Sequence, residues 1–368
     1  MRVLQVSPRY PPNLGGVEKV VEKLSESLSA DGIQVTAFSV DRRPDLPREE
    51  KINGVLVNRF IPLQKTPFRI PEPRFIVALS RNKADIIHLH SVHTLLPLFV
   101  ALFKHKNQKL LIQPHYHRFG QSPFRSSLLK VYRWTLRFVV FSHTSAIIVN
   151  SEYEKQAFCE DFPKCRNVIL IPEGLDTNEL QSHKRDSVVP KRILYVGALQ
   201  GYKNVDWVLK GFAWLRKNEN SDFRLVIVGK GRKRKSLVAL AKRLGIDPYI
   251  EWKQSLSREQ VLSEYAKASV FAFLSRLESF GIVAYEALLM GVPTVVLSSG
   301  PLSSMVKAGF AEGVNSLDQK TIARALFAAL KKTYPRVTKL HAQNFLDWKD
   351  YVHRILNIYK VLLETQRQ

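Results

Sequence analysis

Cysteine and long hydrophobic runs are scarce in this chain of 368 residues. The two cysteines, Cys159 and Cys165, are too few for a disulfide framework or a cysteine metal cluster, and we expect a reducing compartment. Prolines interrupt the segment MRVLQVSPRYPP too early for a signal peptide. No apolar run approaches the ~20 residues that span a bilayer, and LLPLFVALF at 95–103 predicts a buried helix. We expect a cytoplasmic protein that is soluble or peripheral on the cytoplasmic face of a membrane.

Acidic residues are also in short supply, because 32 Asp and Glu face 56 Lys and Arg and leave a formal net charge of +24. This charge predicts anionic partners but does not specify a fold. Between Ile86 and Ser151 there is no Asp or Glu at all. A membrane surface and a nucleic acid both fit such a charge. The sequence has no helix-turn-helix, zinc-finger spacing or RNA-binding aromatic signature, so a nucleic-acid partner is the less favoured alternative.

The segment RSSLLKVYRWTLRFVVF (125–141) lies in this acid-free window and is expected to form a helix. Its basic residues fall on one face with aromatic residues alongside, which is typical of helices that lie in a membrane interface. A core helix with a solvated basic stripe explains the pattern equally well. The residues predicted to meet an anionic membrane or acceptor are Arg118, Arg125, Lys130, Arg133, Trp134 and Arg137.

Short apolar and β-branched runs alternate with helical patterns along the whole chain. The runs lie at 2–7, 34–40, 84–90, 109–114, 146–150 and 168–172, and then at 192–197, 223–229, 249–252, 270–274 and 293–298. Their nearly continuous apolar character, with helices between them, predicts parallel sheets that are covered on both faces. The predicted fold class is α/β, with two doubly wound, Rossmann-like domains.

The polar segment SHKRDSVVPKR (182–192) separates the two series of strands and is predicted to be a linker. We expect an N-terminal domain at 1–181 and a C-terminal domain at 193–346. An apolar stripe from Trp348 to Leu362 predicts a docking helix, and we assign residues 347–368 to the N-terminal domain. Because ligands of doubly wound sheets bind at the carboxyl ends of the strands, a cleft between the domains is the expected site.

Glycine-containing turns follow several predicted strands and can present backbone amides to an anion. Gly15 and Gly16 open the first helix, while Gly197 and Gly229 end two strands of the second domain. None of these turns has the G-x-G-x-x-G spacing of a dinucleotide site, so a nicotinamide cofactor is disfavoured. Lys203 is placed to meet a diphosphate as a point charge, and a solvated loop lysine is the alternative.

Two carboxylates, Glu278 and Glu286, lie in the otherwise apolar run ESFGIVAYEALLMGVP (278–293), with Gly281 between them. On one continuous helix they would point ~80° apart and lie ~12 Å apart along the axis. If the helix starts at Gly281 instead, both side chains lean toward its N-terminus. That end suits a phosphate, and carboxylates beside it suit sugar hydroxyls. A solvated Glu278 and an exposed Glu286 on an amphipathic helix are the alternative.

Taken in this order, the motifs resemble the retaining glycosyltransferases of family four, which have the GT-B architecture. The resemblance covers almost the whole chain. It rests on GGVEKV (15–20), DIIHLH (85–90), NSEYE (150–154), IPEGLD (171–176), VGALQGYKN (196–204), VIVGKG (226–231) and the Glu278–Glu286 block followed by GVP. It implies that the second domain binds a nucleotide-diphosphate sugar of the GDP-mannose or UDP-glucose type and the first an acceptor, with no cofactor and no metal.

The resemblance also implies roles for individual residues. Glu278 would hold hydroxyls of the transferred sugar, Glu286 the ribose hydroxyls, and Lys203 the charge of the leaving diphosphate. Backbone amides at Phe280, Gly281 and the following turn would hold the diphosphate, and Ser279 is also predicted to bind the donor. His115 matches a first-domain histidine that reaches toward the donor sugar. The acceptor hydroxyl is the nucleophile, and an oxygen of the donor phosphate takes its proton.

Several positions depart from the family pattern. They are Glu173 in place of asparagine, Ala198 in place of arginine, Trp252 and Lys253 in place of glycine, and Ser304 in place of glutamate. The missing arginine contact could weaken donor binding by ~1.5–3 kcal/mol. The candidates that could substitute for it are Lys230, Arg232 and Arg234. A catalytically impaired relative with the same fold is therefore an open alternative, whereas the residues of an epimerase or a pyridoxal-dependent phosphorylase are not evident.

The acid-free stretch lies in the domain that is expected to bind the acceptor. We therefore expect a membrane-bound, anionic acceptor, such as a polyprenyl-diphosphate-linked glycan or a phosphoglycolipid. His88 and His90 share one face of the strand predicted at 84–90, and we interpret them as structural lining.

Overall fold

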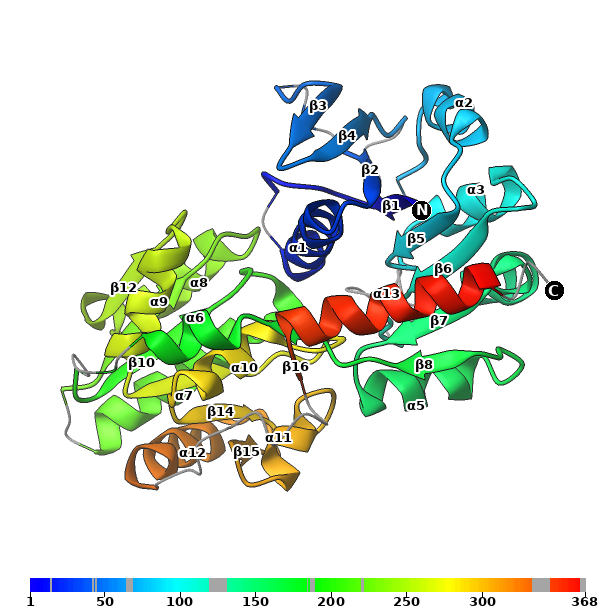
Figure 1. The fold of residues 1–368 in the computed structure, drawn as a ribbon. Coiled ribbons are helices and arrows are strands. Elements are labelled where there is room, and N and C mark those ends of the chain that lie inside the picture. Colours follow the sequence, from blue (N-terminus) through cyan, green and yellow to red (C-terminus); the bar gives the residue numbers. More distant parts are fainter. Residues whose placement is uncertain are drawn as a thin grey trace. The chain divides into compact units, whose positions relative to one another are not determined.

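The computed structural model describes residues 1–13, 15–41, 43, 45–63, 69–118, 131–183, 185, 189–219, 222–332 and 345–364. It has two compact units, one of Met1–Gly174 with Trp348–Gln368 and one of Leu175–Asp347 (Figure 1). The division lies before the predicted linker 182–192. An ion pair helps to explain this difference, because Arg258 Nη2 lies 2.7 Å from Glu179 Oε2 and ties the residues after 174 into the second unit.

Eight strands form the sheet of the first unit in its described part, in the order β3-β4-β2-β1-β5-β6-β7-β8. The strands are β1 (Arg2–Ser7), β2 (Gln34–Val40), β3 (Glu49–Ile52), β4 (Val55–Phe60), β5 (Ile86–His90), β6 (Lys109–Gln113), β7 (Ala146–Val149) and β8 (Val168–Leu170). All pairs are parallel except β3 with β4. The parallel strands predicted for this half are confirmed.

The antiparallel β3–β4 hairpin was not predicted. Its strands are short and partly exposed, so they lack the continuous apolar pattern of the buried strands. The signal was the dipeptide Asn53-Gly54, because both residues have positive φ (46° and 86°) and Asn-Gly is typical of tight hairpin turns.

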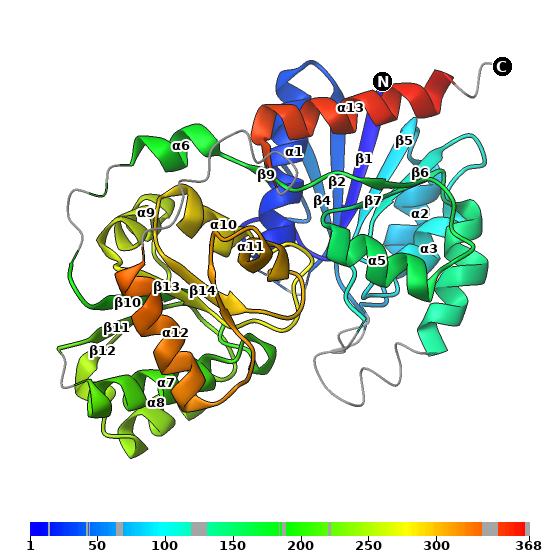
Figure 2. The same ribbon diagram turned by 90° about the horizontal axis from the view of Figure 1, so that it is seen from below.

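The first unit carries helices along its sheet (Figures 1 and 2). They are α1 (Gly16–Ala30), α2 (Pro73–Arg81), α3 (Leu96–Phe103), η1 (Leu136–Val140), η2 (Phe141–His143), α5 (Glu152–Asp161) and α13 (Trp348–Glu364). The expectation of a buried helix at 95–103 is wrong at its end, where Leu102 and Phe103 are exposed. No helix within the described ranges is long and apolar enough to cross a membrane.

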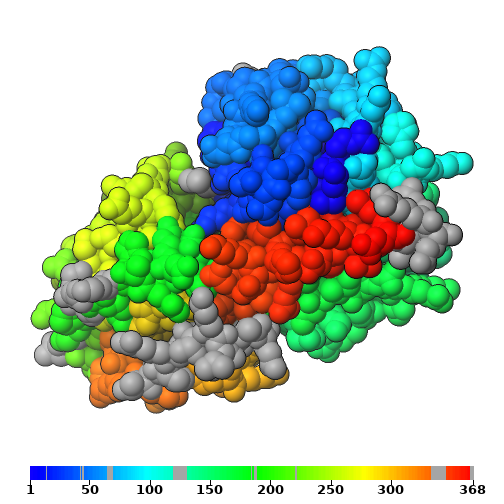
Figure 3. Space-filling view, in the orientation of Figure 1, coloured from blue at the N-terminus to red at the C-terminus, as the bar shows by residue number. Residues whose placement is uncertain are grey.

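The C-terminal helix α13 packs on the first unit. Tyr351, Val352, Ile355 and Tyr359 of the predicted stripe are buried, whereas its end residues Trp348 and Leu362 are partly buried. Trp348 Nε1 donates to Ser27 Oγ of α1 at 3.0 Å. Figure 3 shows the outer face of α13 in red beside the blue residues of α1, and in Figure 2 the helix extends along the ends of β1 and β5.

The described part of the second unit has a parallel sheet in the order β12-β11-β10-β13-β14-β15. Its strands are β10 (Arg192–Val196), β11 (Arg224–Val228), β12 (Ile250–Lys253), β13 (Val270–Phe273), β14 (Thr294–Leu297) and β15 (Glu312–Val314). Its helices are α6 (Thr177–Ser182), η3 (Gly201–Lys203), α7 (Val205–Asn218), α8 (Arg234–Arg243), η4 (Asp247–Tyr249), α9 (Arg258–Lys267), α10 (Ile282–Leu289), α11 (Ser303–Lys307) and α12 (Gln319–Lys331). Strands β9 (Gly174–Leu175) and β16 (Leu346–Asp347) form a separate two-stranded ladder.

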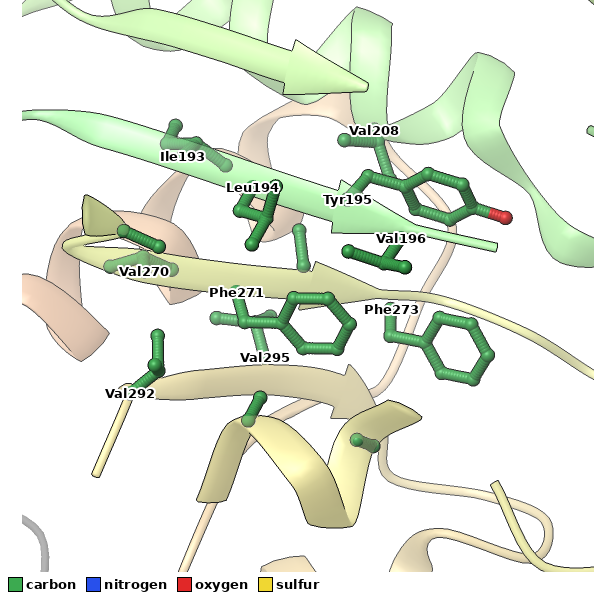
Figure 4. Close-up of a cluster of buried hydrophobic side chains, with 14 of the residues drawn as sticks. Ile193, Leu194, Tyr195, Val196, Val208, Val270, Phe271, Phe273, Val292 and Val295 are labelled. Carbon is green, nitrogen blue, oxygen red and sulfur yellow. The ribbon is translucent and has the colours of Figure 1, made fainter. Parts of the chain in front are cut away.

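Aromatic rings fill the centre of this second core (Figure 4). Phe271 and Phe273 of β13 stack with ring centres 6.0 Å apart, and Tyr195 of β10 stacks on Phe273 at 6.1 Å. Helices on both sides of the sheet exclude water, which is why these strands are apolar on both faces. A rigid core under β10 and β13 fixes the loops that leave their carboxyl ends.

Candidate functional site

The sheet order of the second unit identifies where a ligand is expected. The chain proceeds from β10 outward to β11 and β12, and then returns to place β13 on the other side of β10. The carboxyl ends of β10 and β13 therefore form the topological switch point, where doubly wound sheets bind ligands. Lys203 follows β10 and Glu278 follows β13, so both predicted site residues come from these two loops.

Lys203 and Glu278 form an ion pair in which Nζ donates to Oε1, with both side chains largely buried. The Lys203 ammonium group also lies 4.9 Å from the ring centre of Phe273. Asn204 links the loops that follow β10 and β13, because its Nδ2 donates to the carbonyl oxygen of Leu274 at 2.8 Å. The switch point thus holds one cation and one carboxylate in fixed positions, with the cation over the aromatic ring of Phe273.

Helix α10 starts where the sequence predicted. Gly281 is its N-cap with φ 92°, a conformation that favours glycine, and Glu278 lies in the preceding loop. The first amides of the helix have no intrahelical acceptor and can face an anion. The side chain of Phe280 belongs to the core and stacks on Tyr285 at 4.5 Å. Only the backbone of Phe280 is therefore available to a ligand, and Ser279 lies half-buried beside it.

Glu286 is buried and held by two partners. Its Oε1 accepts from Arg258 Nη1 at 2.7 Å, and its Oε2 accepts from Tyr265 at 3.4 Å. Arg258 also donates to Glu179 Oε2 at 2.7 Å, so one guanidinium joins two carboxylates. Sequence reasoning missed Arg258, because no local pattern relates the start of α9 to α10. A carboxylate with this support keeps its orientation, and the predicted ribose-binding role of Glu286 stays a prediction.

The glycines at the strand ends have a packing role. A Cβ on Gly229 would lie 1.9 Å from the carbonyl oxygen of Gly197, and a Cβ on Gly231 would lie 2.2 Å from that of Leu199. The loops after β10 and β11 therefore touch backbone to backbone. This packing accounts for the glycines without a ligand, so the donor-binding role of Gly197 and Gly229 stays a prediction. Lys230, next to Gly229, is exposed.

In the first unit, Gly15 is the N-cap of α1 and Gly16 its first residue. The Glu18 carboxylate lies against this turn, because a Cβ on Gly15 would come within 2.1 Å of Glu18 Oε2. Burial raises the pKa of Glu18. Protonation of Glu18 would lessen its repulsion of an anion at the turn, and the predicted role of Gly15 and Gly16 stays a prediction.

His115 follows β6 in a left-handed conformation with φ 46°. The residue is only 6% exposed, and burial lowers the pKa of its imidazole to about 3, so the ring is neutral at physiological pH. Its Nδ1 lies 3.1 Å from Asn150 Nδ2. Its Nε2 is buried and has no hydrogen-bond partner among the described residues. The predicted catalytic role of His115 stays a prediction.

Two neighbouring histidines each have a hydrogen-bond partner inside the fold, as their predicted structural role requires, and each leaves its other ring nitrogen without a partner among the described residues. His88 Nδ1 lies 2.7 Å from the Tyr359 hydroxyl, and His90 Nε2 lies 2.8 Å from Gln5 Oε1. Both residues are completely buried. Within the described ranges, no group of three His, Cys, Asp or Glu side chains could hold a metal ion.

Glu173, one of the departures from the family pattern, lies in a buried amide network. Asn150 Nδ2 donates to Glu173 Oε2 at 2.9 Å, and Gln113 Nε2 donates to Asn150 Oδ1 at 2.8 Å. Burial raises the pKa of Glu173 to about 8, although Tyr351 and Gln113 act in the opposite direction. At neutral pH Glu173 is therefore a protonated carboxylic acid at the position where the family pattern has asparagine. A carboxylic acid and an amide have similar shapes and similar hydrogen-bonding atoms.

Glu173→Gln is expected to change the pH dependence of stability. The carboxyl pKa rises from 4.5 to about 8 on folding, so the folded state binds more protons between these values. The free energy of unfolding of the wild type should then fall with rising pH in this window, by up to ~1.4 kcal/mol per pH unit from this group. The variant lacks this decrease and gains stability relative to the wild type from pH 5 to 8.

Urea unfolding at pH 5, 6.5 and 8 measures this difference. Glu160→Gln is the matched control, because Glu160 is exposed and its hydrogen bond to Arg118 lowers its carboxyl pKa. Its difference from the wild type should be constant over the same range. A constant difference for Glu173→Gln as well would mean that Glu173 is ionised in the folded protein.

The predicted basic face is partly neutralised. Arg118 Nε and Arg133 Nη1 each lie 3.1 Å from Asp161 Oδ2, and Arg118 Nη2 lies 2.6 Å from Glu160 Oε2. These acids come from α5, outside the acid-free window, and the predicted membrane or acceptor role of Arg118 and Arg133 stays a prediction. Arg125 and Lys130 lie outside the described residues.

An apolar surface remains beside this ion cluster. Trp134 is 66% exposed and Phe138 53% exposed, with ring centres 5.1 Å apart. Arg137 covers the ring of Phe138 at 5.5 Å. Helix α3 packs against η1, and its exposed Leu102 and Phe103 add to the apolar side chains of this region. We call Leu102, Phe103, Val131, Trp134 and Phe138 the aromatic patch.

Comparison with known families and proteins covers both units. Residues 14–179 match Glycosyltransferase Family 4, and residues 178–343 match Glycosyl transferases group 1. The chain is 24% identical over 387 residues to the GDP-mannose:cellobiosyl-diphosphopolyprenol alpha-mannosyltransferase of Xanthomonas oryzae, covering 100% of this chain and 98% of the relative. It is 24% identical over 429 residues to the D-inositol 3-phosphate glycosyltransferase of Acidothermus cellulolyticus, covering 100% and 91%.

Solved structures share the fold. Sucrose-phosphate synthase from Thermosynechococcus elongatus superposes with a TM-score of 0.76 at 19% identity, covering 99% of each chain. HepE of Anabaena, in complex with UDP and glucose, superposes with a TM-score of 0.75 at 16% identity, covering 98% of this chain and 100% of its own. The predicted architecture is confirmed: the chain belongs to the group 1 glycosyltransferases and has the GT-B fold.

Proposed function

We propose that the protein transfers a hexose from a nucleotide-diphosphate sugar to a hydroxyl of a membrane lipid-linked glycan or glycolipid, with retention of configuration and without a metal. The observation that carries this proposal is the Lys203–Glu278 pair at the switch point of the second unit. A fixed ammonium group can neutralise a leaving diphosphate, which is the task that a metal performs in other transferases. GDP-mannose and UDP-glucose are the two donor types to test.

The proposed reaction uses few protein groups. Glu278 binds hydroxyls of the hexose, Glu286 binds the ribose, and the amides of Ser279, Phe280 and Gly281 bind the diphosphate. The acceptor oxygen forms a bond to the anomeric carbon from the side of the leaving group. The bond from that carbon to the diphosphate oxygen breaks, and the acceptor proton passes to a donor phosphate oxygen. The nucleoside diphosphate leaves with its charge held by Lys203.

The printed descriptions of similar proteins support both the nucleotide-sugar donor and the lipid-linked acceptor. The Xanthomonas oryzae relative is named for a GDP-mannose donor and a diphosphopolyprenol acceptor, and the HepE structure contains UDP and glucose. The test is a transfer assay with GDP-mannose or UDP-glucose and lipid-diphosphate-linked glycans in vesicles. Release of nucleoside diphosphate together with sugar in the lipid fraction supports the proposal. Because Ala198 replaces an arginine, no transfer with bound donor would favour the catalytically impaired relative.

We place the acceptor membrane at the aromatic patch. Exposed Trp and Phe side chains next to Arg137 have the composition of surfaces that bind an interface. Lys106 is exposed just beyond α3 and adds positive charge.

Trp134→Ala combined with Phe138→Ala is expected to reduce binding to anionic vesicles at least ~10-fold. Each side chain loses apolar contact with the interface, worth ~1 kcal/mol or more. Vesicle flotation at low and high salt measures the effect, and wild-type binding should weaken with salt. Tyr153→Ala is the control, because Tyr153 is an exposed aromatic residue outside the patch. Equal losses in both variants, or wild-type binding that ignores lipid charge, would contradict this placement.

A further inference from the structure

A chain of buried hydrogen bonds connects α13 with His115. The Tyr351 hydroxyl donates to Gln113 Oε1 at 3.1 Å, and Gln113 Nε2 donates to Asn150 Oδ1 at 2.8 Å. Asn150 Nδ2 then lies 2.9 Å from Glu173 Oε2 and 3.1 Å from His115 Nδ1. All five residues are buried, so water does not compete for these groups.

The structure orients the amides of Gln113 and Asn150 so that these bonds run from Tyr351 toward His115. Because the Tyr351 hydroxyl faces Gln113 Oε1, the amide nitrogen of Gln113 faces Asn150 and donates to its oxygen. The Asn150 nitrogen faces Glu173 and His115. An amide nitrogen donates two hydrogens and accepts none. His115 Nδ1 must therefore accept, and a neutral imidazole then carries its single hydrogen on Nε2.

The hydrogen on His115 Nε2 has no acceptor among the described residues, although the ring is buried. A buried donor without a partner costs free energy that a ligand oxygen can recover. Burial lowers the pKa of this imidazole to about 3, so protonation of Nδ1 does not occur near neutral pH. The ring is arranged to donate a hydrogen bond and not to accept a proton.

We propose that Tyr351, Gln113 and Asn150 are positioning residues that hold His115 as the Nε2–H tautomer, which donates to an oxygen of the bound donor substrate. The oxygen belongs to the sugar or to the diphosphate. The identity of the ligand rests on the proposed function, whereas the tautomer is a property of the unliganded protein. The C-terminal helix therefore takes part in preparing the site through one hydroxyl group.

Nitrogen NMR of protein labelled with ¹⁵N-histidine distinguishes the two tautomers. His115→Gln identifies the signals of the His115 ring. The wild type should show an unprotonated Nδ1 and a protonated Nε2. Asn150→Asp replaces the donor with an acceptor and should move the hydrogen to Nδ1. Tyr351→Phe removes the first donor and should give a mixture of both forms.

Tyr359→Phe is the matched control. Tyr359 lies on the same helix, is equally buried, and bonds to His88 and Gln5 instead. Its loss should leave the His115 signals unchanged. A wild-type Nδ1–H tautomer, or equal changes in both tyrosine variants, would overturn the proposal. If Asn150→Asp does not fold, the wild type and the two tyrosine variants still show which tautomer His115 adopts and whether Tyr351 controls it.

Activity and ligand titrations separate this inference from the proposed function. Tyr351→Phe should lower kcat ~10-fold with little change in KM, and Tyr359→Phe should lower neither. A nucleoside diphosphate alone should shift the His115 signals if the oxygen is on the diphosphate, whereas a shift only with the sugar nucleotide identifies the sugar. If NMR shows the Nε2–H tautomer but no sugar transfer is detected, the proposed function is rejected and the tautomer assignment still holds.

Discussion

Glu286→Gln is expected to weaken binding of the nucleotide-diphosphate sugar ~10–150-fold while the protein stays folded. A buried carboxylate can accept two charge-assisted hydrogen bonds from a ribose diol, and each loss costs ~1.5–3 kcal/mol. Glutamine keeps the shape of the side chain and one oxygen for Arg258 Nη1, which lies 2.7 Å from Glu286 Oε1. Isothermal titration of the donor into wild type and variant measures the change in Kd.

Glu179→Gln is the control for this change. Glu179 is the other carboxylate bound to Arg258 and lies on α6, so its loss disturbs the same guanidinium without removing the proposed ribose ligand. We expect less than a ~3-fold change in Kd. Similar losses in both variants would show that Glu286 acts only by holding Arg258.

Lys203→Met is expected to lower kcat ~100–1000-fold. A preorganised cation at the leaving diphosphate stabilises the transition state more than the ground state, and loss of one such group has an effect of this size. Single-turnover transfer at saturating donor measures the chemical step. Lys210→Met is the control, because Lys210 pairs with Asp206 on α7 and lies over Trp207.

The stability of the Lys203 variant needs a separate measurement, because Glu278 loses its partner. An unpaired, largely buried carboxylate destabilises a protein, whereas removal of both charges is often nearly neutral. Lys203→Met with Glu278→Gln should therefore regain thermal stability without regaining activity. A double variant that regains transfer would show that Lys203 serves the fold and not the reaction.

Much of the fold could be predicted because parallel strands are apolar on both faces. Strands β1 and β2 occupy the predicted ranges 2–7 and 34–40. The start of α10 was also predictable, since Gly281 separates a polar loop from an apolar helix and adopts a positive φ. Local spacing thus located the loop that carries Glu278.

Contacts between distant segments could not be predicted. Asp161 neutralises Arg118 and Arg133 from another helix, and a count of charges within one window misses this pairing. Arg258 reaches Glu286 from the start of α9 in the same way. The hydrogen bonds that join Tyr351 to His115 run through Gln113 at the end of β6 and Asn150 just after β7, and no sequence spacing encodes them. Their only sequence signal was a polar residue at the carboxyl end of each strand.

A thermal-shift panel of the wild-type protein with GDP-, UDP- and ADP-sugars, in the presence of EDTA, tests the central claim most directly. We predict that the nucleotide sugars of one base raise the melting temperature, Tm, at concentrations at which the nucleotide sugars of the other two bases do not. EDTA should not abolish this shift. The nucleoside diphosphate of that base, without the sugar, should also stabilise the protein. No shift with any of the sugars would contradict a donor site at Lys203 and Glu286, and a shift that requires a divalent metal would contradict the metal-independent role of Lys203.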